Sequence, residues 1–201
     1  VLNGVNLVHE LIRHLTGLLQ RTVGCDAVGI RLRDGDDYPY AETRGFSPEF
    51  VRLESTLCTG GDGEPSTLAC MCGNVLQGRF DPARPYFTPK GTFWTNSTTS
   101  LLATATENEG GARIRNRCNG EGFESVGLVP LRHGGQVLGL LQFNDRAKNR
   151  FTPELLAFLE NVADQVAVAL SQRQMASALA ESEEHYRSLF EHMLNGFAFC
   201  R

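Results

Sequence analysis

The sequence predicts an α+β fold, and three stretches of the chain carry that prediction. Residues 124–145 (ESVGLVPLRHGGQVLGLLQFND) place two apolar arms around a His-Gly-Gly-Gln turn, which is the pattern of a β-hairpin. The second arm is apolar almost throughout, so we expect a central strand that is covered on both faces. Helices are predicted at both ends of the domain: an amphipathic helix over residues 3–23, and a long helix that begins at residues 151–154 (FTPE).

A second hairpin and a short helix are expected between the first helix and residue 56. Residues 25–32 alternate small or apolar residues with polar ones, residues 34–37 form a turn, and residues 38–43 form the returning strand. A short helix should follow over residues 48–53. Its start is indicated by Ser47 as the cap, a proline at the first helical position and an acidic first turn.

Residues 57–122 form an irregular insertion between the strands. We expect a Gly-rich loop over 59–63, short helices over 65–76 and 98–105, and an extended piece over 92–96. A long irregular segment inserted into a compact sheet usually shapes a binding site. The sequence therefore predicts a pocket for a small molecule between this insertion and the sheet.

Bulk properties exclude several function classes. The 201 residues suit one domain with an appendage, and the formal charge of −4 gives no global reason to bind nucleic acid or an anionic membrane. No apolar run approaches the roughly 20 residues that span a bilayer, and no signal peptide opens the chain. We expect a cytoplasmic piece of a larger protein.

The long C-terminal helix is predicted over residues 153–180, with apolar residues near the heptad period. Such a helix would be roughly 40 Å long, which is more than one small domain can cover. A second copy of the chain is the economical partner for the uncovered part. We therefore expect a homodimer that forms through the N- and C-terminal helices.

The hairpin and the insertion together resemble the GAF family of small-molecule sensory domains. The specific features are the ESVGLVPL and GGQVLGLLQF arms, the segment 72–78 (CGNVLQG) and the segment 93–96 (FWTN). The resemblance covers about residues 3–173. It implies a twisted, mostly antiparallel sheet with the helices 3–23 and 153–173 on one face. On the other face it implies an irregular helical insertion over a ligand pocket.

The C-terminal part is similar to the start of a PAS domain, with the helical entrance at 179–191 and a first strand at 193–198. This resemblance divides the chain into a GAF-like domain (1–173), a signalling-helix linker (174–182) and a truncated PAS start (183–201). The GAF–PAS order implies a sensor histidine kinase of a two-component system as the parent protein. It implies downstream PAS and kinase domains as partners in the same chain, and no enzymatic activity in this fragment.

Six cysteines are more than such a domain needs, and four of them lie in the insertion. Cys58, Cys70, Cys72 and Cys118 could together hold zinc or an iron–sulfur cluster. The Cys-x-Cys spacing opposes this site, because Cys70 and Cys72 would point about 200° apart on a helix. Cys72 is then the inward residue.

Two other interpretations of the cysteines stay open. They could form a redox pair or line an organic ligand's pocket, and some GAF-fold proteins that reduce free methionine sulfoxide use cysteines of this region. They could also be small buried residues that only pack in the insertion. A separate alternative for the whole domain is a dimerisation spacer that binds no ligand.

Arginines and aromatic residues complete the candidate site. Arg113, Arg115 and Arg117 could hold an anion, and Phe93 and Trp94 could cover an apolar ligand; solvated arginines and core aromatics are the alternatives. The candidate ligand-binding residues are Cys58, Cys72, Cys118, Phe93, Trp94 and Arg117.

Overall fold

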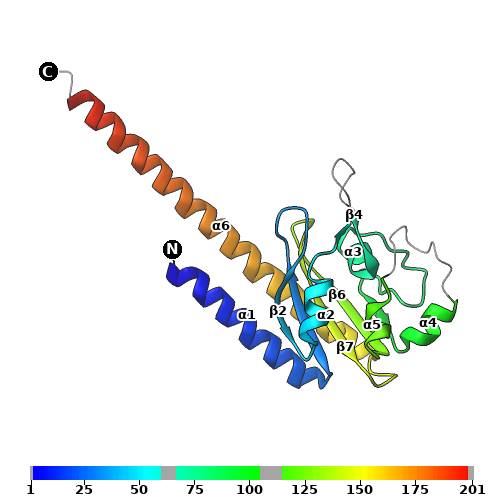
Figure 1. Cartoon of the computed structure of the whole chain (residues 1–201). Helices are drawn as coiled ribbons and strands as arrows, with labels where there is room; N and C mark the ends of the chain where they lie inside the picture. The colour runs from blue at the N-terminus through cyan, green and yellow to red at the C-terminus, as the bar shows by residue number, and fades with distance from the viewer. Residues whose placement is uncertain (1, 60–66, 105–114, 199–201) are drawn as a thin grey trace.

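A computed structural model describes residues 2–59, 67–104 and 115–198 of the chain (Figure 1). The helices are α1 Leu2–Val23, α2 Pro48–Glu54, α3 Cys70–Leu76, α4 Thr98–Thr104, α5 Arg117–Gly120 and α6 Pro153–Ala198. The strands are β1 Ala27–Leu32, β2 Tyr40–Arg44, β3 Cys58–Thr59, β4 Thr67–Leu68, β5 Phe93–Thr95, β6 Ser125–His133 and β7 Gln136–Asp145. Five of these strands form an antiparallel sheet in the order β2-β1-β7-β6-β5, which confirms the predicted α+β fold.

The β6–β7 hairpin forms as predicted. Its register runs from the pair Ser125–Asp145 to the pair His133–Gln136. Gly134 and Gly135 have φ values of +57° and +78°, the combination that a two-residue type I′ turn requires and that glycine adopts without strain. Since β7 lies in the middle of the sheet and is buried from Leu138 to Asp145, the prediction of a central strand is confirmed.

The sheet separates two hydrophobic cores. On one face α1 and α6 pack against Val129 and Leu131 of β6 and against Leu141 and Phe143 of β7. On the opposite face, which carries α2 to α5 in Figure 1, the insertion packs against the alternate positions of the same strands. The two helices on one face and the insertion on the other match the expected layering.

Two side chains fix the start of α6 on the sheet. The Asn96 amide donates to the carbonyl oxygen of Phe151 and accepts from its N–H, both at 2.8 Å. The Thr152 hydroxyl accepts from the N–H of Leu155 at 3.2 Å, as an N-cap does. The first turn of α6 therefore has a fixed place at the end of β5.

The C-terminal helix is longer than predicted. α6 is continuous for 46 residues, so residues 193–198 are helical and the prediction of a PAS-like strand there is wrong for this structure. The helix also crosses both predicted domain boundaries, at 174 and 183. No glycine or proline occurs from residue 174 to residue 195, so nothing in this stretch breaks the helix. Within the described part of the chain, no helix has the length and hydrophobicity to span a bilayer.

Several shorter elements differ at their ends from the prediction. The helix expected over 65–76 begins only at Cys70, because Thr67–Leu68 pairs with Cys58–Thr59 as a two-stranded ribbon. The cap of α2 is confirmed, since the Ser47 hydroxyl accepts from the N–H of Phe50 at 3.1 Å. Most of the Gly-rich loop 59–63, together with residues 105–114, lies outside the described residues.

Removing the Asn96 side chain should loosen α6 from the sheet. Asn96→Ala leaves the Phe151 N–H and carbonyl without their partner, so we expect a loss of about 1–3 kcal/mol in the free energy of unfolding. Denaturant unfolding measures this loss. The control Asn161→Ala changes an exposed asparagine of α6 and should stay within about 0.5 kcal/mol of the parent protein. Equal stability of the two variants would contradict the assigned role of Asn96.

Candidate functional site

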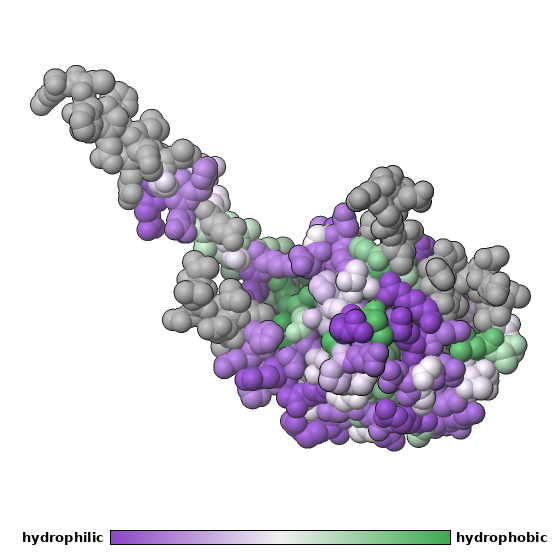
Figure 2. Space-filling model, in the orientation of Figure 1, coloured by the Kyte–Doolittle hydropathy of each residue, from purple (hydrophilic) through white to green (hydrophobic). Residues whose placement is uncertain are grey.

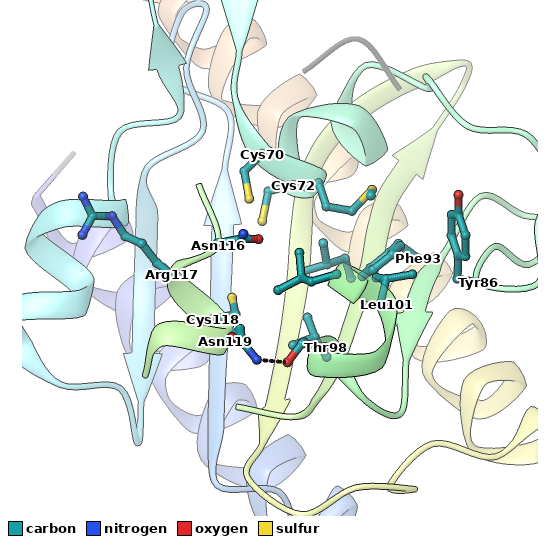
Figure 3. A pocket seen from close by; sticks show the side chains of 14 residues that line it. Cys70, Cys72, Tyr86, Phe93, Thr98, Leu101, Asn116, Arg117, Cys118 and Asn119 are labelled. Atoms are coloured by element: carbon teal, nitrogen blue, oxygen red, sulfur yellow. Dashed lines mark hydrogen bonds between the residues drawn. The ribbon is translucent and has the colours of Figure 1, made fainter. Parts of the chain in front are cut away.

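A cavity of about 80 Å³ lies between the sheet and the insertion (Figure 3). Strands β5 and β6 form one side of it, and α3, α4 and α5 form the others. The lining residues are mostly apolar: Cys70, Met71, Cys72, Tyr86, Phe93, Thr98, Leu101, Leu102, Asn116, Arg117, Cys118, Asn119, Val126 and Leu128. A space of this size holds several waters or a small ligand, and an apolar lining favours the ligand.

Cys70 and Cys72 both line this cavity. This differs from the expectation that their side chains would point in nearly opposite directions on a helix. Cys70 is the first residue of α3, and its φ of +65° places it in the left-handed region instead of the helical one. As a result its thiol lies beside that of Cys72 in Figure 3. Asn116, at the start of α5, is a second non-glycine residue with positive φ in the cavity wall. Such conformations cost about 1–3 kcal/mol each and concentrate at functional sites.

Two of the thiols in the cavity wall, those of Cys72 and Cys118, are held in the neutral form. Burial raises the pKa of Cys72 well above its ordinary value and raises the pKa of Cys118 to about 12. The Arg31 guanidinium opposes this rise at both thiols without reversing it. Neutral thiols are weak nucleophiles, so these two residues supply soft, polarisable surface and not reactive thiolates.

The four-cysteine site does not assemble. Cys58 lies on β3, where its thiol donates to the carbonyl oxygen of Asp36 at 3.5 Å, and it lies outside the cavity wall described above. Among the described residues, no group of three or more His, Cys, Asp or Glu side chains is placed to hold a metal ion. Of the four predicted cysteines, the structure thus brings together Cys70, Cys72 and Cys118.

A polar network borders the cysteine end of the cavity. Arg31 is completely buried and donates to the carbonyl oxygens of Tyr38, Glu54 and Ser55, with its Cζ 3.6 Å above the ring of Tyr40. Tyr40 in turn donates to the Oε1 of Gln142 at 2.7 Å. The two Nη atoms of Arg31 thus join β1 to the end of α2, and the Tyr40–Gln142 bond joins β2 to β7. The Nε of Arg31 has no hydrogen-bond partner among the described residues, so burial of this guanidinium keeps part of its cost.

The arginines of the insertion bind a protein carboxylate. Glu54 is buried at the end of α2, and its Oε1 lies 2.8 Å from the Nε of Arg117 and 3.7 Å from an Nη of Arg115. Burial raises the pKa of Glu54, and the charges of Arg115 and Arg31 oppose that rise. Figure 3 shows Arg117 extending away from the cysteines, so its guanidinium does not present itself to the cavity. Arg113 lies outside the described residues.

The two aromatic candidates lie on opposite faces of the sheet. Phe93 is buried and lines the cavity. Trp94, the next residue of β5, packs against the core formed with α1 and α6. Neighbouring residues of a strand point to opposite faces, so only one of the two could reach the cavity. The assignment of Trp94 to the ligand site is therefore wrong in this structure.

The sequence analysis missed most of the wall that α4 and α5 provide. Asn119 donates to the hydroxyls of Thr98 and Thr99, both at 3.0 Å, and Glu124 accepts from the N–H and the hydroxyl of Thr99. The first of these bonds is drawn in Figure 3. These contacts hold α4 against α5 and over the cavity, and no local pattern in the sequence signals them. The period-two spacing of Val126 and Leu128 could have placed both in the wall.

The pKa of Cys118 leads to a test of its reactivity. At pH 8, iodoacetamide should alkylate Cys118 of the folded protein at least about 100-fold more slowly than in the unfolded chain, because the thiolate is scarce below pH 12. Mass spectrometry of the peptide that contains Cys118 gives both rates. Fast alkylation at pH 7 would show an activated thiolate, as an enzyme nucleophile requires.

Comparisons with known proteins agree with the observed fold. No curated protein matches the chain. A domain from Sinorhizobium meliloti 1021 that is described as part of a two-component sensor histidine kinase superposes with a TM-score of 0.57, at 16% identity, over 84% of this chain and 94% of its own. A type II free methionine-R-sulfoxide reductase from Thermoplasma acidophilum superposes with a TM-score of 0.53, at 16% identity, over 81% and 91%.

A GAF domain/HD domain protein from Geobacter sulfurreducens superposes with a TM-score of 0.58, at 18% identity, over 87% of this chain and 99% of its own. At such low identities these structures establish the common fold alone. The GAF domain profile matches residues 8–170 of the sequence, which is most of the chain. The chain therefore belongs to the GAF domain family.

Proposed function

We propose that this GAF domain is the ligand-sensing input module of a signalling protein, in which occupancy of the cavity is relayed through α6. The cavity between the sheet and the insertion is the observation that carries this proposal. The fold shared with a domain described as part of a sensor histidine kinase supports the kinase as the parent. On this proposal the downstream partners are PAS and kinase domains in the same cytoplasmic protein.

The ligand proposed for the cavity is a small, uncharged and predominantly apolar molecule. Its walls are mostly carbon and sulfur, and hydrogen-bonding groups come from Thr98, Asn116 and Asn119. Among the described residues, Arg31, Arg115 and Arg117 already bind Glu54 or backbone carbonyls, so a carboxylate or phosphate would have to displace those partners. This pairing disfavours an anionic ligand.

The relay requires a partner for α6. A helix of 46 residues is about 70 Å long, and it projects far beyond the sheet in Figure 1. Met175, Leu179 and Tyr186 are more than half exposed on it, as are Leu11 and Leu18 on α1. Figure 2 shows apolar surface along the middle of α6 and mostly hydrophilic surface elsewhere on this view of the domain. A second copy of the chain, paired through α1 and α6, would cover these residues.

Cysteine redox chemistry is the second candidate function, because Cys70, Cys72 and Cys118 line one cavity and the fold is shared with a free methionine-R-sulfoxide reductase. The raised pKa values of Cys72 and Cys118 weigh against it. A metal or iron–sulfur cofactor has weaker support, since the described residues bring no four-cysteine set together. Sensing by reversible binding needs no thiolate and agrees with the neutral thiols.

A co-purified ligand would test the binding proposal. We expect solvent extraction of the purified full chain, followed by mass spectrometry, to release a small apolar compound. Val126→Phe places a ring in the cavity and should reduce the compound at least about tenfold. Ala157→Phe adds the same ring on the exposed side of α6 and should retain it. Equal amounts in both variants would place the compound elsewhere and contradict the assignment of the cavity.

The dimer proposal is tested by one added charge. Leu179→Glu should weaken dimerisation at least about tenfold, because a carboxylate would have to enter the apolar interface. Ser177→Glu adds the same charge about 200° away on the helix and should have little effect. Sedimentation equilibrium measures both constants. A monomeric parent chain, or equal dissociation constants for the two variants, would contradict pairing through this face.

A further inference from the structure

One segment of the insertion contacts both the cavity and the output helix. Residues 86–92, here called the crossover segment, begin at Tyr86, which lines the cavity, and lead directly into Phe93, which lines it too. A β-bridge between Phe87 and Phe93 joins the two ends of the segment. The N–H of Trp94 also donates to the carbonyl oxygen of Tyr86 at 2.9 Å. A displacement of Tyr86 would therefore move the whole segment.

The other side of the crossover segment is bonded to α6. The Lys90 ammonium lies 2.9 Å from the Oδ2 of Asp164, and the Thr88 hydroxyl donates to the carboxylate of Glu160. Glu160 and Asp164 are four residues apart, so both carboxylates lie on the same side of the helix. These contacts are roughly 2.5 to 3.6 turns beyond the Asn96 bonds that fix the start of α6.

The crossover segment is also bonded to the wall that carries the cysteines. Arg132 of β6 donates to the carbonyl oxygen of Lys90 and, at 3.1 Å, to that of Val75 in the last turn of α3. One guanidinium thus joins α3 to the crossover segment. A shift of either wall of the cavity, Tyr86 or α3, is passed to residue 90.

The fit of the crossover segment against α6 is incomplete. A cleft of about 190 Å³ lies between them, lined by Lys90, Thr92, Arg132, Glu160 and Asp164, among others. The hydroxyl of Thr92 is fully buried there and has no hydrogen-bond partner within the described residues. An unpaired buried hydroxyl has a cost that a second arrangement of the segment could remove. The cleft beside the segment and the unpaired Thr92 hydroxyl are both features expected of a segment that can adopt two positions.

We propose that the crossover segment is a latch that passes the state of the cavity to α6. An occupant that displaces Tyr86 withdraws Lys90 and Thr88 from Asp164 and Glu160 and so releases the second and third turns of the helix. The latch is weak: the Lys90 and Asp164 side chains are about half exposed, and exposed pairs of this kind are easily opened. A ligand that prefers the open latch by a modest factor can therefore shift its population.

This inference rests on the proposed sensing function, so its test must separate the two. The latch variant is Thr88→Val combined with Lys90→Met, and the control is Arg13→Met, which removes an equally exposed ion pair with Glu10 from α1. Val126→Phe serves as a built-in occupant of the cavity. Xenon under pressure serves as a reversible occupant. It acts on the parent chain, so the test can be made even if Val126→Phe folds poorly. The readout is hydrogen exchange of the amides of residues 160–170.

We expect either occupant to raise exchange at residues 160–170 by about 2- to 10-fold in the parent and control chains. The latch variant should exchange at the raised rate from the start, and an occupant should add no further increase. If an occupant raises exchange in the latch variant by the same factor as in the parent chain, the latch is overturned, but a relay from the cavity to the helix still stands. An increase confined to the cavity walls in every chain would overturn both the relay and the latch.

Discussion

The structure depends on the burial of the β6–β7 hairpin on both faces. Because β7 has β1 and β6 as neighbours and a hydrophobic core on each side, a shift of the hairpin would disturb both cores at once. The sheet is therefore a rigid partition. The relay that we propose would therefore go round an edge of the sheet, and the crossover segment lies next to β5, the edge strand.

The kind of ligand that the cavity can bind depends on whether the charged groups around it are already paired. Three described guanidinium groups around it are engaged: Arg31 with carbonyls and the Tyr40 ring, Arg117 with Glu54, and Arg132 with the carbonyls of α3 and the crossover segment. What remains for a ligand is apolar surface, the cysteine side chains and a few amide and hydroxyl groups. Such a site selects by shape and polarisability, and it needs no proton or electron transfer to report occupancy.

Local patterns predicted the elements that local physics determines. The Gly134–Gly135 turn, the Ser47 cap and the continuously apolar second arm each specify their structure within a few residues, and all three are confirmed. The left-handed conformation of Cys70 could not be predicted, because tertiary packing imposes it on a residue that normally avoids it. It is also what brings the Cys-x-Cys pair to one cavity, and the helical assumption gave the opposite result.

Long-range pairings account for the other errors. The contact of Arg117 with Glu54 joins residues far apart in the chain, and the choice between Phe93 and Trp94 depends on which face of β5 meets the insertion. At the C-terminal end of α6, helix propensity agrees with the structure better than the family resemblance does. Residues 193–198 are helical, whereas the resemblance to a PAS domain implied a strand.

The central claim is that filling the cavity moves α6 relative to the sheet. Pulsed electron resonance between spin-labelled unnatural amino acids at Gln136, at the exposed tip of the hairpin, and at Gln172 on α6 measures that displacement directly. The account predicts that xenon in the cavity shifts the mean distance by about 1–2 Å, the scale of helix shifts in switching proteins, or adds a second distance. An unchanged distance distribution with the cavity filled would contradict it.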